Sequence, residues 1–393
     1  MTTPEPIPAE RSRLSVRSDS VASRVELSAA DSSPAPTDRL RVAVVGLGIG
    51  RSHLRRGYAS LADRFEVMAL CDIDRQRAED AAEEHGVARV VTDFAEVCRM
   101  DDVDVVDICT PPHLHYEQIL QVLEAGKHAV CEKPLVSSLR EVDDVARAES
   151  RSGKRVMPIF QYRFGHGMQK LKLLMARGLT GQAYLGTLET AWRRRPEYYA
   201  VAWRGKWATE RGGALLSHAI HNHDLLCYVL GAPRRLFAYT TTRVNDIEVE
   251  DCAAIALEMA DGSAASSGVT LGSPDEISRL RFSFRGLVAE SNTQPYTSSA
   301  DPWTFVGDSP EITAQIGATL AEFQPLPEHY AGQFYRLYEA LRTGGELPVT
   351  LADARRSIEM ITAMYYSSQT GQSVSLPIGS EHPRYESWLP VGD

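Results

Sequence analysis

Glu132-Lys133-Pro134 follows a short apolar run, residues 128–131, and so stands where a buried strand would end. A lysine at the carboxyl end of a parallel strand faces the ligand crevice of the sheet. An ammonium group there suits a reaction in which an oxygen becomes negative, because it stabilises alkoxide character and lowers the pKa of a hydroxyl group. The alternative is a solvated Lys133 that pairs with Glu132.

A histidine-rich segment, SHAIHNHD at residues 217–224, is the second place where we expect chemistry. On a helix, Ser217, His221 and Asp224 fall on one stripe. His221 is the predicted proton acceptor, since imidazole titrates near neutral pH, and Asp224 either orients it or is a polar residue at a domain junction. His218 lies off the stripe, so a structural role competes there with substrate contact. Histidines at this helical spacing do not converge on one ion, and we predict no metal site.

A glycine-rich turn follows the first apolar run, residues 40–45, and opens a helix. Gly46, Gly48 and Gly50 let the backbone turn tightly and approach a pyrophosphate, which the free N–H groups of a helix start can bind. The regular dinucleotide motif has its third glycine one place later, where this chain has Arg51, so a plain strand–helix turn is the alternative. The residues expected to contact the cofactor here are Gly46, Gly48, Ile49, Gly50 and Arg51.

Asp72 ends the second predicted strand, about 20 residues beyond the glycine turn, where dinucleotide-binding chains carry an acid. A carboxylate there accepts both ribose hydroxyls of NAD and repels the 2′-phosphate of NADP. We therefore predict NAD, with NADP left open because Arg75 stands nearby. Capping of the next helix is the alternative role, for which Asp74 is better placed. Further cofactor contacts are expected at Thr110, Pro111, His115, Glu132 and Lys133, although the proline after Thr110 has the simpler alternative role of ending its strand.

Aromatic and basic side chains gather just before the histidine-rich segment. Aromatic faces suit the C–H surfaces of a sugar, and arginine suits hydroxyl, carboxylate or phosphate groups. A place in the core or in a subunit interface is the alternative. We expect at least one member to contact substrate and single out Trp203. The group consists of Trp192, Arg193, Arg194, Arg195, Tyr198, Tyr199, Trp203, Arg204, Lys206 and Trp207.

These side chains need elements to position them, and the chain alternates strand and helix patterns over residues 39–160. Short β-branched runs separated by helical sequence predict right-handed crossovers, and hence a doubly wound parallel sheet of the Rossmann type. Over residues 161–378 the pattern predicts a second α/β domain with an open, mostly antiparallel sheet and closing helices. Such a domain would present substrate to the first one.

Three local predictions belong to that second domain. Asp261-Gly262 predicts a hairpin between two strands. Residues 212–231 predict one helix that ends at Gly231, whereas residues 290–325 have weak periodicity and predict a loop.

The bulk composition excludes several classes of function. A net charge of -10 over 393 residues is unlike a nucleic-acid-binding surface, and no apolar stretch approaches the length of a membrane span. Six cysteines occur without a C-x-x-C pair, and Cys71, Cys109 and Cys131 each sit near the end of an apolar run, which predicts buried thiols in a reducing cytoplasm. Residues 1–38, rich in Ser, Pro and Ala, predict a disordered tail, and residues 379–393 a C-terminal tail.

The ordered set of motifs resembles the glucose–fructose oxidoreductase / inositol dehydrogenase family (Gfo/Idh/MocA). The resemblance runs from about residue 40 to 378, through VAVVGLGIGRSH, ALCDIDRQRA, ICTPPHLHYEQILQVLEAGKHAVCEKPL, QYRF and GGALLSHAIHNHDLLCYVLG. It implies NAD(P), a homodimer or homotetramer built on the open sheet, and substrates such as sugars, inositols or nucleotide-sugars.

The resemblance also implies roles for individual residues. Lys133 matches the lysine that positions substrate, before a peptide bond that is often cis; His221 matches the acid/base, and Arg163 a segment near the active site. Ser217 replaces the usual Asp and cannot hold a compensating negative charge. Arg51 replaces the usual third glycine.

Together these features predict a hydride transfer between NAD(P) and a secondary alcohol or ketone of a sugar, polyol or nucleotide-sugar. Lys133, His221 and Ser217 are the expected catalytic set, and Arg163, Trp203, His218 and Asp224 the expected substrate contacts. One alternative is an NAD-dependent enzyme that cleaves a glycosidic bond by transient oxidation. Another is a non-catalytic NAD(P)-binding sensor or accessory protein, for which Ser217 is the one encouragement.

Overall fold

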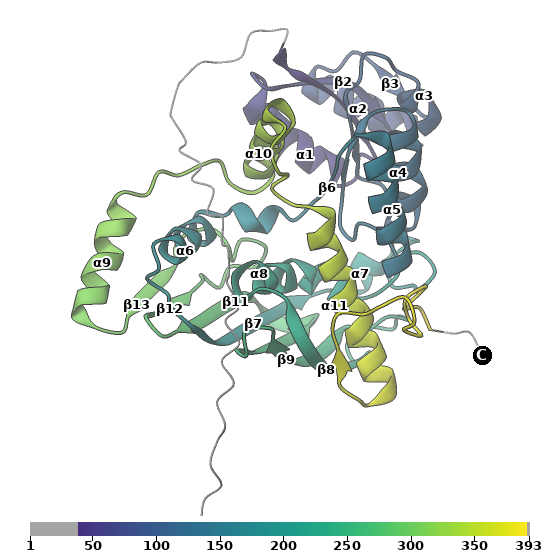
Figure 1. Ribbon diagram of the computed structural model, residues 1–393. Helices are drawn as coiled ribbons and strands as arrows, with labels where there is room; N and C mark the ends of the chain where they lie inside the picture. The colour runs from purple at the N-terminus through teal and green to yellow at the C-terminus, as the bar shows by residue number, and fades with distance from the viewer. Residues whose placement is uncertain (1–37, 391–393) are drawn as a thin grey trace, which may run out of the picture.

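The computed structural model describes residues 38–390, and residues 1–37 of the predicted disordered tail lie outside that range, as do residues 391–393. Its first sheet has six strands in the order β3-β2-β1-β4-β5-β6, every neighbouring pair being parallel. Buried β-branched runs form these strands because helices cover both faces (Figure 1). The strands are β1 (Leu40–Val45), β2 (Phe65–Cys71), β3 (Val90–Val91), β4 (Val105–Ile108), β5 (His128–Cys131) and β6 (Val156–Pro158).

Capping residues mark the starts of α2 and α5 in this first part. Asp74 caps α2 by accepting a hydrogen bond from the Arg77 N–H, and Gly86 ends that helix in the left-handed conformation. Ser138 caps α5 in the same way. The elements are α1 (Gly50–Arg56), η2 (Tyr58–Leu61), α2 (Arg75–His85), α3 (Phe94–Cys98), η3 (Pro112–Leu114), α4 (His115–Glu124) and α5 (Leu139–Ser152).

The second sheet has eight strands in the order β13-β12-β11-β7-β10-β9-β8-β14. Its neighbouring strands are antiparallel except for β10 and β7. Together the two sheets confirm the predicted fold class. The strands are β7 (Ala183–Arg193), β8 (Pro233–Thr241), β9 (Cys252–Met259), β10 (Ala264–Thr270), β11 (Gly272–Phe284), β12 (Leu287–Glu290), β13 (Thr304–Gly307) and β14 (Val374–Ser375).

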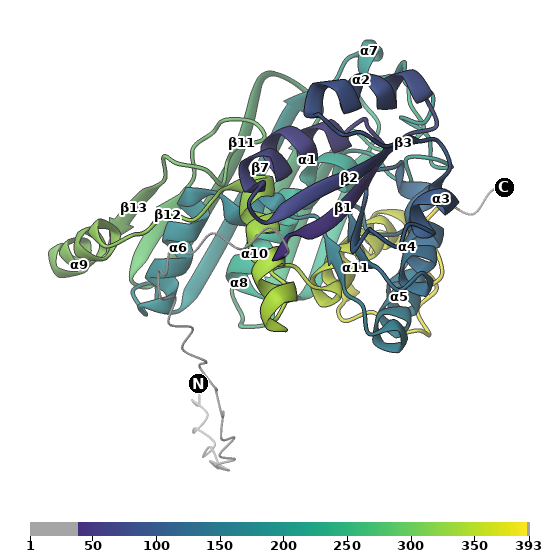
Figure 2. The ribbon, with the colours of Figure 1, turned by 90° about the horizontal axis from the view of Figure 1, so that it is seen from above.

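Helices cover one face of the second sheet and connect it to the first. In Figure 1, α8 lies over the middle of the sheet and α11 runs beside β8. Figure 2 shows α10 returning to lie next to the first sheet, where Phe334 stacks on Tyr58. The elements are η4 (Gln161–Phe164), α6 (His166–Ala176), α7 (Pro196–Tyr199), η5 (Leu215–Ala219), α8 (Ile220–Leu230), α9 (Pro310–Ala321), α10 (His329–Thr343) and α11 (Leu351–Thr370).

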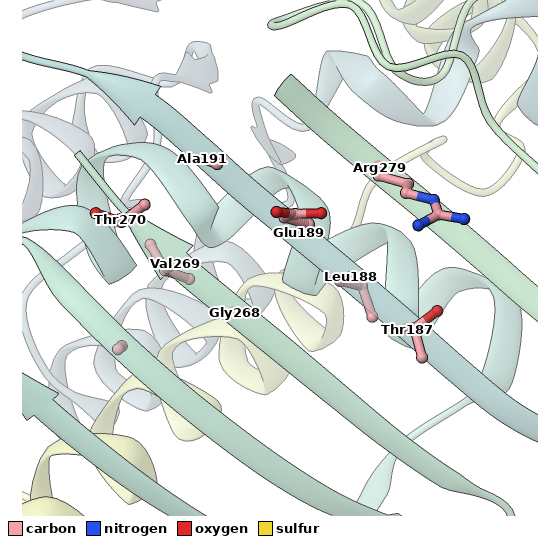
Figure 3. A pocket seen from close by; sticks show the side chains of 9 residues that line it. Thr187, Leu188, Glu189, Ala191, Gly268, Val269, Thr270 and Arg279 are labelled. Atoms are coloured by element: carbon pink, nitrogen blue, oxygen red, sulfur yellow. The ribbon is translucent and has the colours of Figure 1, made fainter. Parts of the chain in front are cut away.

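No helix within residues 38–390 covers the other face of the sheet. Asn222 of α8 reaches the Thr190 hydroxyl, so the neighbouring side chain of Glu189 points to the opposite face, because successive residues of a strand alternate. A pocket there is lined by residues of β7, β9, β10 and β11, and Figure 3 shows the side chains of Thr187, Glu189 and Arg279 among its lining. This surface is the one on which the predicted homo-oligomer would be built.

One local prediction was wrong. Residues 290–325 contain β13 and α9 in addition to loops, and the helix start was readable, because Ser309 accepts from the Ile312 N–H and Pro310 occupies the first turn. The helix predicted over 212–231 is confirmed and ends at Gly231, but its first part is a π-helical turn, η5, before α8. The predicted hairpin at Asp261-Gly262 is confirmed, since β9 and β10 pair antiparallel on either side of it.

Candidate active site

The carboxyl ends of β1, β2, β4 and β5 bring the predicted cofactor residues to one edge of the first sheet. Gly46 ends β1 with a φ of +88°, and a Cβ atom there would lie 2.7 Å from the carbonyl carbon of Cys109. The turn therefore requires glycine at this position. At Gly48 a Cβ atom would meet nothing within 4 Å, so that part of the loop faces open space. A backbone that turns this tightly beside open space fits a pyrophosphate.

Asp72 is bound to the glycine loop itself. One carboxylate oxygen accepts from the Leu47 N–H at 2.8 Å, and the other accepts from the Asp74 N–H at 2.9 Å. The guanidinium of Arg77 lies 3.3 Å away. Arg51 donates to the carbonyl oxygen of Arg77 at 3.2 Å. Asp72 thus fixes the loop and stands at the end of β2, the position from which a carboxylate reaches an adenosine ribose.

His115 does not face the cofactor edge, so the prediction of a cofactor contact was wrong for this residue. Its ring is fully buried, with Nδ1 2.8 Å from the carbonyl oxygen of Pro134 and Nε2 2.8 Å from that of Thr110. Burial lowers the pKa of His115. The imidazole therefore joins the loop after β4 to the loop after β5, and the Thr110 hydroxyl donates to Gln118 at 2.6 Å.

Glu132 is also committed elsewhere, to a buried network that the sequence did not reveal. Its Oε1 lies 3.0 Å from His53 Nε2 and accepts from the Tyr330 hydroxyl, while Oε2 accepts from the Lys133 N–H. His53 Nδ1 lies 2.8 Å from Asp107. The predicted cofactor contact of Glu132 stays a prediction, since these bonds already engage both of its carboxylate oxygens. Burial alone would lower the pKa of His53, but Asp107 and Cys109 together outweigh it, and the pKa is raised well above its ordinary value.

The same network contains a cluster with metal-ligand chemistry. Ligand atoms of His53, Asp107 and Cys109 lie within 4.8 Å of one another. Both ring nitrogens of His53 already face carboxylates, Asp107 on one side and Glu132 on the other. We therefore describe the cluster as an ion-pair network that anchors the start of the Glu132-Lys133-Pro134 segment.

Lys133 meets the histidine-rich segment from the other half of the molecule. Its ammonium donates to the backbone carbonyl oxygen of Ser217 at 2.8 Å. The Lys133–Pro134 peptide bond is cis, as the resemblance implied. Burial lowers the pKa of Lys133, and Glu132 opposes that shift. The end of β5 and the turn η5 therefore form one site.

His221 lies one helical turn beyond Ser217 and is nearly buried. Its ring stacks on Tyr162 with centroids 4.3 Å apart, and its Nδ1 has no hydrogen-bond partner among residues 38–390. Burial, with the charge of Lys133, lowers the pKa of His221 to about 3. The imidazole is therefore neutral at physiological pH and able to accept a proton.

Arg163 and Asp224 form a buried ion pair, which corrects two predictions. The guanidinium Nε donates to Asp224 at 2.7 Å, Nη2 bonds the other carboxylate oxygen, and Asp353 lies 3.1 Å from Nη2. Both side chains are only 3% exposed. Asp224 therefore neither orients His221 nor contacts substrate, and Arg163 joins η4 to α8 and to the start of α11.

The aromatic and basic group surrounds Lys133 on the side of the second sheet. His218 Nε2 accepts from the Arg194 guanidinium at 3.1 Å, and its Nδ1 is buried without a partner among the described residues. The Arg204 guanidinium lies 3.9 Å from the Tyr198 ring centroid and 4.6 Å from that of Trp203. Both arginine charges act to lower the pKa of Lys133, which places them near its ammonium.

Glu210 is a site residue that sequence reasoning missed. It is 1% exposed, and its carboxylate accepts from the Ser217 hydroxyl at 2.8 Å. The signal in the sequence was an acid two residues before Gly212-Gly213, at the start of the histidine-rich segment.

Two family models match the sequence of this chain. Residues 40–160 match the GFO_IDH_MocA model, described as an oxidoreductase family with an NAD-binding Rossmann fold, and residues 168–286 match the GFO/IDH/MocA C-terminal domain. No helix within residues 38–390 has both the length and the apolar character to cross a membrane.

Individual relatives have low sequence identity to this chain, and some match it over most of its length. The uncharacterized oxidoreductase YrbE of Bacillus subtilis is 25% identical over 350 residues, which are 86% of this chain and 97% of that protein. The D-glucoside 3-dehydrogenase of Escherichia coli is 32% identical over 49% of this chain and 55% of its own length. The WlbA dehydrogenase of Bordetella pertussis, solved with NADH and UDP-GlcNAcA, superposes with a TM-score of 0.75 and 26% identity, over 87% of this chain and 100% of that one.

Proposed function

Because the chain belongs to the Gfo/Idh/MocA family of NAD-dependent oxidoreductases, we propose that it moves a hydride between NAD and a secondary alcohol of a sugar, polyol or nucleotide-sugar. The observation that supports this reaction most is the 2.8 Å hydrogen bond from Lys133 to the Ser217 carbonyl oxygen. This bond joins the Lys133 ammonium, at the end of β5, to the turn η5, which precedes the neutral His221 of α8. An alcohol bound between them would meet both groups.

The residues at the strand ends fit the cofactor. Gly46 and Gly48 provide a close backbone approach for the pyrophosphate, and Asp72 provides an acceptor for the ribose hydroxyls. NAD, when bound, supplies the acceptor for the hydride. NADP stays an open alternative, because Arg51 and Arg77 lie beside Asp72.

Lys133 and His221 divide the work on the substrate hydroxyl. The Lys133 ammonium exchanges its bond to Ser217 for one to the substrate oxygen, and so stabilises negative charge there. His221 is neutral because of its lowered pKa, and it accepts the hydroxyl proton. In the direction of ketone reduction the same imidazole returns the proton. Ser217 serves through its carbonyl oxygen, which holds the ammonium in place before substrate arrives.

The substrate class rests on the relatives and on the surrounding side chains. D-glucoside 3-dehydrogenase and the WlbA complex with UDP-GlcNAcA are named for carbohydrate derivatives. Rings of Trp203 and Tyr198 beside the Arg204 guanidinium suit a sugar ring and its oxygen-rich substituents. His218, with a free buried Nδ1, is a further substrate contact in this proposal.

A panel of sugars, polyols, uronic acids and nucleotide-sugars, each assayed with NAD and with NADP, tests the proposal by absorbance of the reduced cofactor. Net NADH with a ketone product supports it. Glycosidic bond cleavage without net NADH would replace it by the transient-oxidation alternative. Tight NAD binding without turnover of any compound would favour a sensor or accessory protein. A homodimer or homotetramer and a cytoplasmic location stay predictions.

A further inference from the structure

We propose that Glu210 is the positioning residue of the Lys133 ammonium: it fixes the Ser217 turn and supplies the negative charge that Ser217 lacks. The proposal rests on the proposed function for the role of Lys133 in turnover, but its structural basis is independent of substrate. Two hydrogen bonds in series carry it. Lys133 donates to the Ser217 carbonyl oxygen at 2.8 Å, and the hydroxyl of the same serine donates to Glu210 at 2.8 Å.

Burial raises the pKa of Glu210, and two hydrogen bonds oppose that shift by favouring its carboxylate form. Oε1 accepts from Ser217, and Oε2 accepts from the Gly205 N–H at 2.5 Å. The side chain is buried, and it forms no ion pair within 4.0 Å among the described residues. A buried carboxylate without a contact cation is costly, so its charge is balanced by cations slightly further away. Lys133 and Arg204 are the cations whose charges act on it.

Ser217 transmits the position of Glu210 to Lys133 because it sits in the π-helical turn η5. Such turns interrupt the regular hydrogen bonding of a helix and are frequent at functional sites. The Ser217 N–H bonds to the Gly213 carbonyl oxygen, while its own carbonyl oxygen accepts from Lys133. The hydroxyl bond to Glu210 therefore restrains the same residue whose carbonyl oxygen accepts from the ammonium.

Two acids act on the charge of Lys133, and Glu210 is the one that forms no ion pair with another cation among the described residues. Burial, Arg204 and Arg194 disfavour a charged lysine, whereas Glu132 and Glu210 favour it. Glu132 already balances the His53 imidazole, which it contacts at 3.0 Å. The titratable and charged groups that face this site are Glu132 from the end of β5, Arg194 from the end of β7, Arg204 and Glu210 from the loop before η5, His218 from η5 and His221 from α8.

A purely structural role for Glu210 makes a different prediction. It would tie the loop at Gly205 to η5, and its loss would lower stability without changing the ionisation of Lys133. The two roles are separated by replacing Glu210 with Gln, which keeps the shape and one acceptor oxygen and removes the charge.

The first readout is the pH at which the Lys133 amine becomes reactive. The full chain, without added cofactor, is pulse-acetylated with acetic anhydride across a pH series, and the modified Lys133 peptide is quantified by mass spectrometry. In Glu210→Gln the midpoint is expected to fall by about one pH unit or more, since an opposite charge a few ångströms away shifts a pKa by that order. Glu248→Gln is the matched control, because Glu248 accepts from the Trp207 N–H in the same loop but does not act on Lys133.

The second readout is a charge exchange. In the double variant Glu210→Gln with Ser217→Asp, the carboxylate moves onto η5, and the midpoint is expected to return to the wild-type value or above. Should Glu210→Gln alone fail to fold, the double variant still decides. In the double variant, an acetylation midpoint below the wild-type value by about half a pH unit or more would overturn the proposal. In a folded Glu210→Gln variant, an unchanged midpoint would overturn it as well.

Turnover then separates this proposal from the proposed function. With a substrate in hand, the alkaline limb of kcat/KM in Glu210→Gln is expected to move to lower pH together with the acetylation midpoint. If no compound is turned over, the acetylation midpoint still reports on Glu210. A limb that stays in place while substrate is oxidised would overturn the role of Glu210 and leave the dehydrogenase assignment intact.

Discussion

The Lys133 ammonium donates a 2.8 Å hydrogen bond to the carbonyl oxygen of Ser217, which is 84 residues further along the chain. This bond joins the end of β5 in the parallel sheet to the π-helical turn that precedes α8. It therefore brings the cation and the histidine of the proposed reaction into one site. Most of the predictions below follow from this junction or from the groups that support it.

Removing the ammonium should abolish turnover without releasing the cofactor. Lys133→Ala is expected to lower kcat by about a hundredfold to a thousandfold, the usual loss when a preorganised donor to a developing oxyanion is deleted. The glycine loop and Asp72 are untouched, so NAD should still bind when measured by fluorescence, although the predicted cofactor contact of Lys133 itself is lost. Lys154→Ala is the control, because Lys154 precedes β6 and so lies at the edge of the parallel sheet opposite to Lys133. Equal activity in Lys133→Ala would remove the assigned role.

The acid limb of the pH profile should lie unusually low. The pKa of His221 is lowered to about 3, chiefly by burial and then by Lys133. The neutral base form of His221 is therefore present above that pKa and is lost only as the pH falls through it. As the pH is lowered from about 7 to about 5, the range in which an ordinary histidine titrates, kcat/KM for alcohol oxidation should not fall. His221→Asn is expected to lower kcat by about a hundredfold or more. An acid limb near pH 6.5, the ordinary value, would contradict the burial argument.

Arg163 and Asp224 should matter for stability and not for substrate affinity. Breaking a buried ion pair leaves an uncompensated charge, so Arg163→Met is expected to lower the free energy of unfolding by about 3–5 kcal/mol. The double variant with Asp224→Leu should lose less, because no charge is left alone. Urea unfolding measures both variants. Additive losses in the double variant would show that the two residues do not act as a pair.

Asp72 should decide between the two nicotinamide cofactors. Asp72→Ser removes the acceptor for the ribose hydroxyls and the charge that repels a 2′-phosphate, while Arg51 and Arg77 stay nearby. The affinity for NAD is expected to fall about tenfold to a hundredfold, in line with the loss of charged hydrogen bonds, and that for NADP to rise. Titration of each cofactor, followed by fluorescence, checks this. A parallel fall in both affinities would mean that Asp72 acts only by holding the Leu47 N–H.

Arg204 should discriminate among substrates. Its guanidinium lies against Tyr198 and Trp203 and has no hydrogen-bond partner or ion pair among the described residues. Arg204→Met is therefore expected to raise KM for a uronic acid or nucleotide-sugar by about tenfold or more, and that for the neutral sugar by much less. Steady-state kinetics on a matched acid and neutral pair gives the ratio. An equal rise for both would indicate a loop defect.

The fold and the cofactor edge could be predicted because they follow from local patterns. Apolar runs and helix caps identify the strands and helices of the first half, and parallel strands bring the residues that follow them to one edge. Gly46, Asp72 and Lys133 were located in this way. Cys71, Cys109 and Cys131 were expected to be buried, and they are.

The buried polar partners could not be predicted, because they are chosen by tertiary structure. Arg163 pairs with Asp224, which is 61 residues away in the sequence, and no local pattern in either segment predicts this partner. His115 and Glu132 likewise lie at the correct strand ends but turn toward carbonyl oxygens and His53. A regular helical stripe through residues 217–224 was assumed, whereas the π turn shifts Ser217 relative to α8.

The most direct test of the central claim is single-turnover transfer of deuterium from the carbinol carbon of the best substrate to NAD. The label would be located by NMR in the wild type, in Lys133→Ala and in His221→Asn. Direct transfer to the nicotinamide ring in the wild type is predicted, slowed about a hundredfold or more in each variant while NAD binding is retained. Label lost to water, or transfer at the wild-type rate in both variants, would contradict the claim that these two side chains act on one bound alcohol.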